Sequence, residues 1–230
     1  MTTPISASGR CALLLVLVVP ALLAAEPTIA PIFGAGMVVQ RDRPIPVWGT
    51  ADDGTAVVVA LGTDRVTAVA AAGRWEVALP AGPASAEPMT LTISLAGQER
   101  TFTDVLVGEV WLCSGQSNMA GTVAARPPRE IADLPLVRAY GKPRGGGKDG
   151  PSWMTAVGEA KMHFSAVGIY FGENLHRELQ VPVGLIQAAV SGTPIEQWTP
   201  LAELEGDAAV KAVLDRLKDR DLLTRINEER

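Results

Sequence analysis

Residues 108–119, with the sequence GEVWLCSGQSNM, decide the fold class of this chain. Glu109 to Cys113 form a nearly continuous apolar run, which is typical of a strand buried on both faces of a parallel sheet. Gly115 permits a sharp turn after this strand, and a helix is predicted to follow. A serine at such a turn lies at the carboxyl edge of the sheet, where open α/β folds bind their ligands. The position of Ser117 therefore makes it a candidate nucleophile.

Two roles are open for the serines of this turn. The hydroxyl of Ser117 would be exposed, and its backbone N–H could face a developing oxyanion near the positive end of the following helix. Alternatively, Ser114 and Ser117 only cap the start of that helix, as serines commonly do. The local sequence leaves both roles open.

The residues before this turn predict short antiparallel strands. Thr90 to Leu95 alternate polar and apolar side chains, and Trp75, Val77 and Leu79 recur at every second position, so each segment has one face to bury. Turn signals rich in glycine and proline separate these segments. We therefore predict a small antiparallel β-sandwich over residues 26–107.

The residues after the turn have the pattern of a parallel α/β unit. Residues 136–140 and 183–190 predict strands, and apolar side chains at helical spacing predict a helix over residues 164–180. We also expect a mobile loop rich in glycine and lysine over residues 141–150 and an amphipathic helix over residues 207–230.

Residues 1–25 are predicted to be a secretory signal. Arg10 precedes an unbroken apolar run from Cys11 to Ala25, which is the layout of such a signal. A membrane-spanning helix needs about 20 apolar residues. This run is shorter and contains Pro20, so we expect no stable membrane anchor. The mature protein would be exported, to the periplasm or to the extracellular space.

The composition argues against several classes of function. The formal net charge is -5 and the basic residues are not clustered, which argues against nucleic acid as a partner. Without the signal, Cys113 is the one remaining thiol, so no internal disulfide can form. Its apolar neighbours predict a packing role rather than a reactive thiolate. Two separated histidines and one thiol do not make a metal site, and we expect neither a metal nor a cofactor.

Two long motifs resemble the sialate O-acetylesterase family of the SGNH hydrolase superfamily. They are the stretch at residues 108–119 and VPVGLIQAAVSGTPIEQWT at residues 181–199. MVVQRDRPIPVWG, at residues 37–49, resembles the sandwich that precedes the catalytic domain in bacterial members. The resemblance implies an α/β protein with an N-terminal antiparallel β-sandwich. Residues 108–230 would then form an incomplete SGNH-type three-layer α/β/α domain with a parallel sheet.

The resemblance implies hydrolysis of acetyl esters on sugars, with an acetylated carbohydrate as the substrate. The hydroxyl of Ser117 would attack the acetyl carbonyl, and the N–H groups of Ser117 and Gly192 would hold the oxyanion. The substrate contacts that we expect are Gln116, Asn118, Thr193 and Glu196.

For three further residues we weigh a functional role against a structural one. Glu196 and Trp198 could line a sugar pocket, or they could cap and pack the turn after Pro194. His176 lies inside the predicted helix, where we expect a packed or solvated side chain rather than a catalytic base.

The family continues into a Gly-Glu-Ser-Asn motif and an Asp-x-x-His motif that supplies the base, and neither occurs in this sequence. We therefore expect a truncated chain with a low rate, because a serine needs a positioned base. An alternative is a non-catalytic glycan-binding protein or relic that retains the sandwich. A third possibility is a partner polypeptide that supplies the missing strands.

Overall fold

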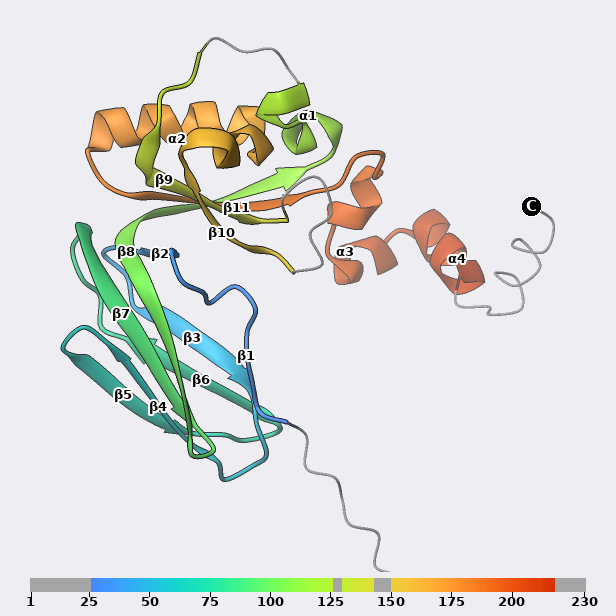
Figure 1. Ribbon diagram of the computed structural model, residues 1–230. Coiled ribbons are helices and arrows are strands. Elements are labelled where there is room, and N and C mark those ends of the chain that lie inside the picture. The colour runs from blue at the N-terminus through green and yellow to red at the C-terminus, as the bar shows by residue number, and fades with distance from the viewer. Residues whose placement is uncertain (1–25, 126–129, 143–149, 218–230) are drawn as a thin grey trace, which may run out of the picture.

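The computed structural model describes residues 26–125, 130–142 and 150–217. The predicted signal segment, residues 143–149 of the predicted loop and the end of the predicted 207–230 helix lie outside the described residues. The protein is of the α/β class. Its described part contains a 3-stranded antiparallel sheet and an 8-stranded mixed sheet (Figure 1).

The N-terminal strands of the two sheets share one hydrophobic core. The smaller sheet has the order β1 (Thr28–Ile29), β3 (Ile45–Thr50) and β6 (Arg74–Leu79). The larger sheet contributes β4 (Ala56–Leu61), β5 (Asp64–Val69), β7 (Ser85–Leu95) and the first part of β8 (Gln98–Gly115). Trp75 of the smaller sheet and Ile93 of the larger one belong to the same buried cluster. The predicted alternation is confirmed, because every second side chain of β6 and of residues 91–95 is buried.

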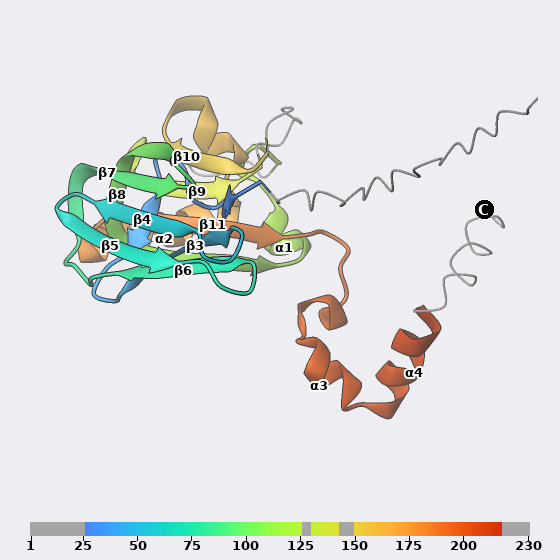
Figure 2. The ribbon, with the colours of Figure 1, turned by 90° about the horizontal axis from the view of Figure 1, so that it is seen from below.

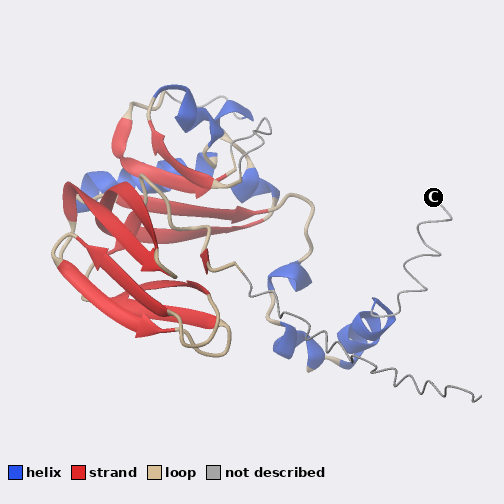
Figure 3. Ribbon diagram, turned by 60° about the horizontal axis from the view of Figure 1, so that its bottom comes forward, coloured by secondary structure: helices blue, strands red, loops and turns tan. Residues whose placement is uncertain are grey.

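The strand β8 connects this N-terminal part to the parallel strands. It pairs antiparallel with β7 in its first part and parallel with β11 (Val183–Ala189) from residue 109 onward. Next to β11 lie β9 (Leu134–Gly141) and β10 (Ser152–Ala156), so the order at this end is β10-β9-β11-β8. The short strand β2 (Val38–Gln40) pairs in parallel with β8 at residues 106–108. Figure 3 draws the strands in red and the helices in blue.

The helix α2 (Ala166–Leu179) packs on one face of the parallel strands (Figure 1). It begins after Ser165, whose hydroxyl accepts a hydrogen bond from the N–H of Gly168. A Cβ on Gly172 would lie 3.1 Å from side-chain atoms of Leu185 and Val137, so glycine allows the close approach of helix and sheet. The predicted helix over residues 164–180 is confirmed.

The last described elements extend away from the sheets (Figure 2). They are a 3-10 turn, η3 (Ile195–Trp198), followed by α3 (Leu201–Glu205) and α4 (Ala208–Leu217). The helix predicted to begin at residue 207 corresponds to α4. None of the helices in the described ranges has both the length and the apolar character needed to cross a membrane.

Side chains of β9 and β10 tie the parallel strands to the N-terminal part. Arg138 is 5% exposed, and its guanidinium donates hydrogen bonds to the backbone carbonyl and the carboxylate of Asp104 at 2.5 and 2.9 Å. The indole of Trp153 donates to the carbonyl of Ile32 at 2.7 Å and packs against the N-terminal core. These contacts hold the two parts together. The strand β8 also runs through both parts, so the connection between them is not a flexible linker.

The prediction that residues 109–113 are buried on both faces is wrong. Trp111 is 43% exposed and Leu112 is 65% exposed, whereas Cys113 is buried. The reason is that the described part of β8 after residue 108 pairs with β11 on one side, and its other edge carries no strand. On that open edge the N–H of Val110 donates a hydrogen bond to the side-chain oxygen of Gln40 at 2.9 Å.

Candidate active site at the ends of β8 and β11

Ser117 lies at the turn between β8 and the short helix α1 (Ser117–Ala120). Gly115 ends the strand with φ +131°, a backbone conformation that favours glycine. Ser117 is exposed and is the first residue of α1. The cap is provided by Gln116, so the reading of Ser114 and Ser117 as the capping residues is wrong.

The side chain of Gln116 engages both polar groups of Ser117. Its amide oxygen accepts from the backbone N–H of Ser117 at 3.2 Å and from the Ser117 hydroxyl at 2.9 Å. The N–H that we expected to hold an oxyanion is therefore already bonded. A substrate carbonyl that used this donor would have to replace the Gln116 amide oxygen.

Gly192 follows the neighbouring strand at the same edge of the sheet. The parallel register pairs Ala189 with Gly115, and the N–H of Val190 donates to the carbonyl of Gly115 at 3.0 Å. Gly192 is exposed and has φ +80°, which requires the conformational freedom of glycine. The structure thus brings the two segments that carry Ser117 and Gly192 side by side.

The turn after Gly192 is held by its own side chains. The hydroxyl of Thr193 donates to the carbonyl of Val190 at 2.7 Å and accepts from the indole of Trp198 at 2.8 Å. These bonds favour the packing role for Trp198. Glu196 is exposed on η3.

A cavity of about 600 Å³ lies beside this edge. It is lined by α1 and by the carboxyl ends of β9 and β11, and by a 3-10 turn, η2 (Gly158–His163). Residues that line it include Met119, Thr122, Lys142, His163, Gln187 and Ser191. Small-molecule sites have volumes of this order.

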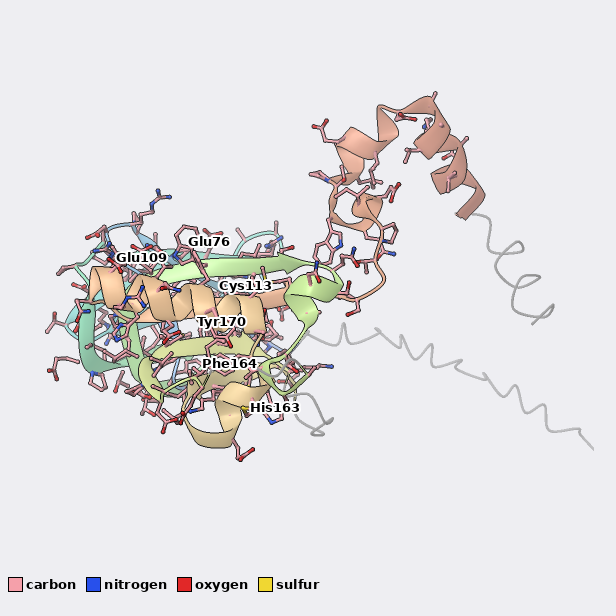
Figure 4. All side chains as sticks on the ribbon, turned by 90° about the horizontal axis from the view of Figure 1, so that it is seen from above. Glu76, Glu109, Cys113, His163, Phe164 and Tyr170 are labelled. Carbon is pink, nitrogen blue, oxygen red and sulfur yellow. The ribbon has the colours of Figure 1, made fainter. Side chains whose placement is uncertain are left out.

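The turn that carries His163 is fixed by charged and backbone contacts. Asp133 accepts from Lys161 at 2.8 Å and from the N–H of Gly158 at 2.9 Å, and these two bonds lower the pKa of the Asp133 carboxyl. The next residue, Phe164, is fully buried, and its carbonyl accepts from the N–H of Val123. Figure 4 labels His163 and Phe164 at the end of this turn.

Comparisons with known proteins identify the family. A family model described as carbohydrate esterase, sialic acid-specific acetylesterase, matches residues 107–222. The chain belongs to this sialic acid-specific acetylesterase family. It is 34% identical to the sialate O-acetylesterase of Pongo abelii and 32% identical to that of Homo sapiens, over 71% of the chain in both cases. It spans 37% of the length of each of these relatives.

A solved structure supports the same assignment to the acetylesterase family. The crystal structure of a carbohydrate acetylesterase from Xanthomonas citri superposes with a TM-score of 0.66 at 32% sequence identity. The superposition covers 78% of this chain and 44% of the other.

The side chain of His176 has a structural role in this protein. The ring Nδ1 of His176 lies 2.8 Å from the carbonyl of Val181, just beyond the end of its own helix. Within the described ranges, no group of three or more histidine, cysteine, aspartate or glutamate residues is arranged to hold a metal ion.

Cys113, in β8, is buried beneath α2. Its side chain belongs to the core beneath α2, and burial raises the pKa of its thiol (Figure 4). We expect the peptide containing Cys113 to react with iodoacetamide at mildly alkaline pH about 100-fold more slowly in the folded protein than in urea, because the reactive species is the exposed thiolate. Peptide mass spectrometry measures both rates, and equal rates would show that Cys113 is accessible and its thiol unprotected.

Proposed function

We propose that this protein is a carbohydrate O-acetylesterase of the sialate type, with Ser117 as its nucleophile. The observation that carries the proposal is the exposed Ser117 at a strand-to-helix turn, inside the motif that resembles this family. Membership of the sialic acid-specific acetylesterase family supports the substrate class, an acetyl ester on a sugar.

The reaction follows from the chemistry of such a serine. The Ser117 oxygen attacks the acetyl carbonyl, its proton passes to a base, and the carbonyl oxygen becomes an oxyanion held by the N–H groups of Ser117 and Gly192. Collapse breaks the bond to the sugar oxygen, which leaves as the alcohol after taking up a proton. Water then attacks the acetyl group on Ser117 and releases acetate. Gln116, Asn118, Thr193 and Glu196 are the proposed substrate contacts around this centre.

The base is proposed to come from outside these 230 residues. The Ser117 hydroxyl is bonded to the amide of Gln116, which is not a base at neutral pH. The sequence contains neither the Gly-Glu-Ser-Asn nor the Asp-x-x-His motif. Without that base the oxyanion donors and substrate binding give a residual acceleration of roughly 10³-fold over water. A polypeptide that adds strands beside β8 and carries the acid and the histidine would raise this rate.

We also propose a division of the chain into domains and a cellular location. We infer that residues 26–107 form a β-sandwich domain and that residues 108–230 form part of an SGNH-type three-layer domain. The shared core of the N-terminal strands and the parallel order β9-β11-β8 support this division. Residues 1–25 would direct export of the protein to the periplasm or the extracellular space and would be removed from the mature protein.

A direct test is to trap the acetyl group on Ser117. Attack by Ser117 and attack by water are both slow without a base, but the two steps differ in their leaving groups. 4-Nitrophenolate leaves without protonation, whereas the serine oxygen is a much poorer leaving group when water attacks the acetyl-enzyme. A chain without that base should therefore accumulate the acetyl-enzyme. We expect peptide mass spectrometry to find the acetyl group on Ser117, together with a burst of 4-nitrophenol of about one equivalent.

Matched serine variants make this test specific. Ser114→Ala changes a serine of the same turn and should retain the burst, whereas Ser117→Ala should lose it. An unchanged burst in Ser117→Ala, or acetylation confined to lysines, would overturn the assignment of the nucleophile. The same preparations are then assayed for acetate release from O-acetylated N-acetylneuraminic acid, where release by the wild-type chain above the Ser117→Ala rate supports the substrate class.

A further inference from the structure

The cavity beside α1 is lined by close sequence neighbours of Ser117 and Gly192, although neither of these two residues lines it. Met119 and Ala120, which line it, follow Ser117 in the same short helix. Val190 and Ser191, on its other side, immediately precede Gly192. Any molecule in this cavity therefore lies next to the turn that holds Ser117.

The position of Lys142 relative to the turn follows from the register of the strands. Tyr140 and Leu112 both pair with Ile186 of the central strand β11. Tyr140 and Leu112 are therefore separated by two strand spacings, about 10 Å, and Lys142 and Ser114 each follow two residues later in the chain. A sugar that spans the carboxyl ends of these strands can reach both the Lys142 end and the Ser117 end of the site.

None of the described residues that line the cavity has a negative side chain, although the protein is acidic. The formal net charge of the chain is -5, yet the lining residues in the described ranges include neither an aspartate nor a glutamate. Lys142 is exposed and forms no ion pair with a described residue. Its ammonium group is thus free of competition from the carboxylates in the described part of the chain.

Two further hydrogen-bond donors line the cavity, and contacts with neighbouring residues hold each of them in place. His163 ends the turn that Asp133 and Lys161 hold, and its ring offers an N–H. The amide oxygen of Gln187 accepts from the N–H of Ser165 at 2.6 Å. This bond fixes the orientation of the Gln187 side chain and leaves its amide NH₂ group as the remaining donor.

We propose that this cavity is a binding site for the carboxylate of an acidic sugar, with Lys142 supplying the charge and His163 and Gln187 supplying hydrogen bonds. The proposal rests on the proposed function and adds the residues that select the substrate. A carboxylate bonded by an ammonium group and N–H donors is held more tightly than a neutral ester of the same shape. Acetylated sialic acids would be selected over acetylated neutral sugars.

Binding of N-acetylneuraminic acid and of its methyl ester tests the site without any need for catalysis. The two ligands differ in charge at one group and share the rest of the sugar. We expect isothermal titration calorimetry at low salt to give a Kd about tenfold lower for the acid, since one hydrogen-bonded charge contributes roughly this much in an exposed site. About 1 M NaCl should remove most of the difference.

Variants of single residues test whether the preference for the acid over the methyl ester arises in the cavity. Lys142→Met keeps most of the side-chain length, removes the charge and should reduce the preference for the acid to about twofold or less. Lys211→Met changes an exposed lysine of α4 and should leave the tenfold preference unchanged. His163→Gln should weaken binding of the acid about threefold. Thermal unfolding of each variant confirms that it is folded.

The outcomes separate this proposal from the proposed function. Equal affinity of the wild-type protein for acid and ester, no binding of either, or an unchanged preference in Lys142→Met would each overturn the carboxylate site. Acetylation of Ser117 by 4-nitrophenyl acetate does not depend on Lys142, so its failure alone would overturn the enzyme assignment. A retained preference for the acid without acetylation would instead indicate a glycan-binding protein.

Discussion

Gly108→Ala is expected to lower the free energy of unfolding by about 3 kcal/mol or more, because the added methyl group has no room. A Cβ at this position would lie 2.0 Å from the carbonyl oxygen of Pro182 and 2.6 Å from its carbon. These are backbone atoms, so no side-chain rotation can relieve the contact. The same carbonyl accepts from the N–H of Glu109 at 2.9 Å, which is where the pairing of β8 with β11 begins.

Gly108→Ala should also change the geometry of the candidate active site. Separation of Pro182 from residue 108 would disturb the register that places Ser117 beside the Gly192 turn. Gly82→Ala is the matched control, because no atom lies within 4 Å of the added Cβ and its φ is not positive. Urea unfolding should place Gly82→Ala within about 0.5 kcal/mol of the wild-type protein. Equal midpoints for the two variants would contradict the close packing at residue 108.

Asp104→Ala is expected to cost about 3 kcal/mol of stability. The substitution removes the carboxylate that pairs with Arg138, whose side chain is 6% exposed, and a buried guanidinium without its partner is strongly destabilising. The exposure of Asp104 itself, at 48%, keeps the cost below that of a fully buried pair. Alanine also tolerates the observed φ of +57° at Asp104 less well than aspartate does.

Asp104→Asn removes the negative charge of the Arg138–Asp104 pair and keeps the shape of the side chain. Asparagine keeps a side-chain oxygen for the guanidinium and accepts a positive φ, so we expect a cost of about 1 kcal/mol. Urea unfolding measures both variants. Because Arg138 already has its buried Nε without a hydrogen-bond partner in the structure, it depends on the contacts of its two terminal nitrogens with Asp104. A wild-type midpoint for Asp104→Ala would show that the pair contributes nothing.

Much of the local structure could be predicted from the sequence. The alternation in β6 and β7 and the helical spacing of α2 each come from a repeat over consecutive residues, which is present before folding. The strand-to-helix turn at Ser117 was predicted because its glycine and its neighbours are contiguous. The burial of Cys113 was predicted from its apolar neighbours for the same reason.

Other features could not be predicted because they depend on contacts between distant segments. The exposure of Trp111 and Leu112 depends on which strands flank β8, and no property of residues 109–113 reports that. The cap by Gln116 was missed because glutamine is an uncommon capping residue. Lys142 and Gln187 were missed as site residues because they lie in separate segments of unremarkable composition.

The sequence by itself determined the α/β class, the main strands and the helix α2, the family, and Ser117 as the candidate nucleophile, since each is encoded in contiguous residues. The tertiary structure decided which strand ends meet, and therefore that Met119 beside Ser117, Ser191 beside Gly192, Lys142 and His163 line one cavity. The physical reason is that hydrogen-bonded register between parallel strands fixes the relative height of residues far apart in the chain. That register is a property of the folded sheet, which no single segment specifies alone.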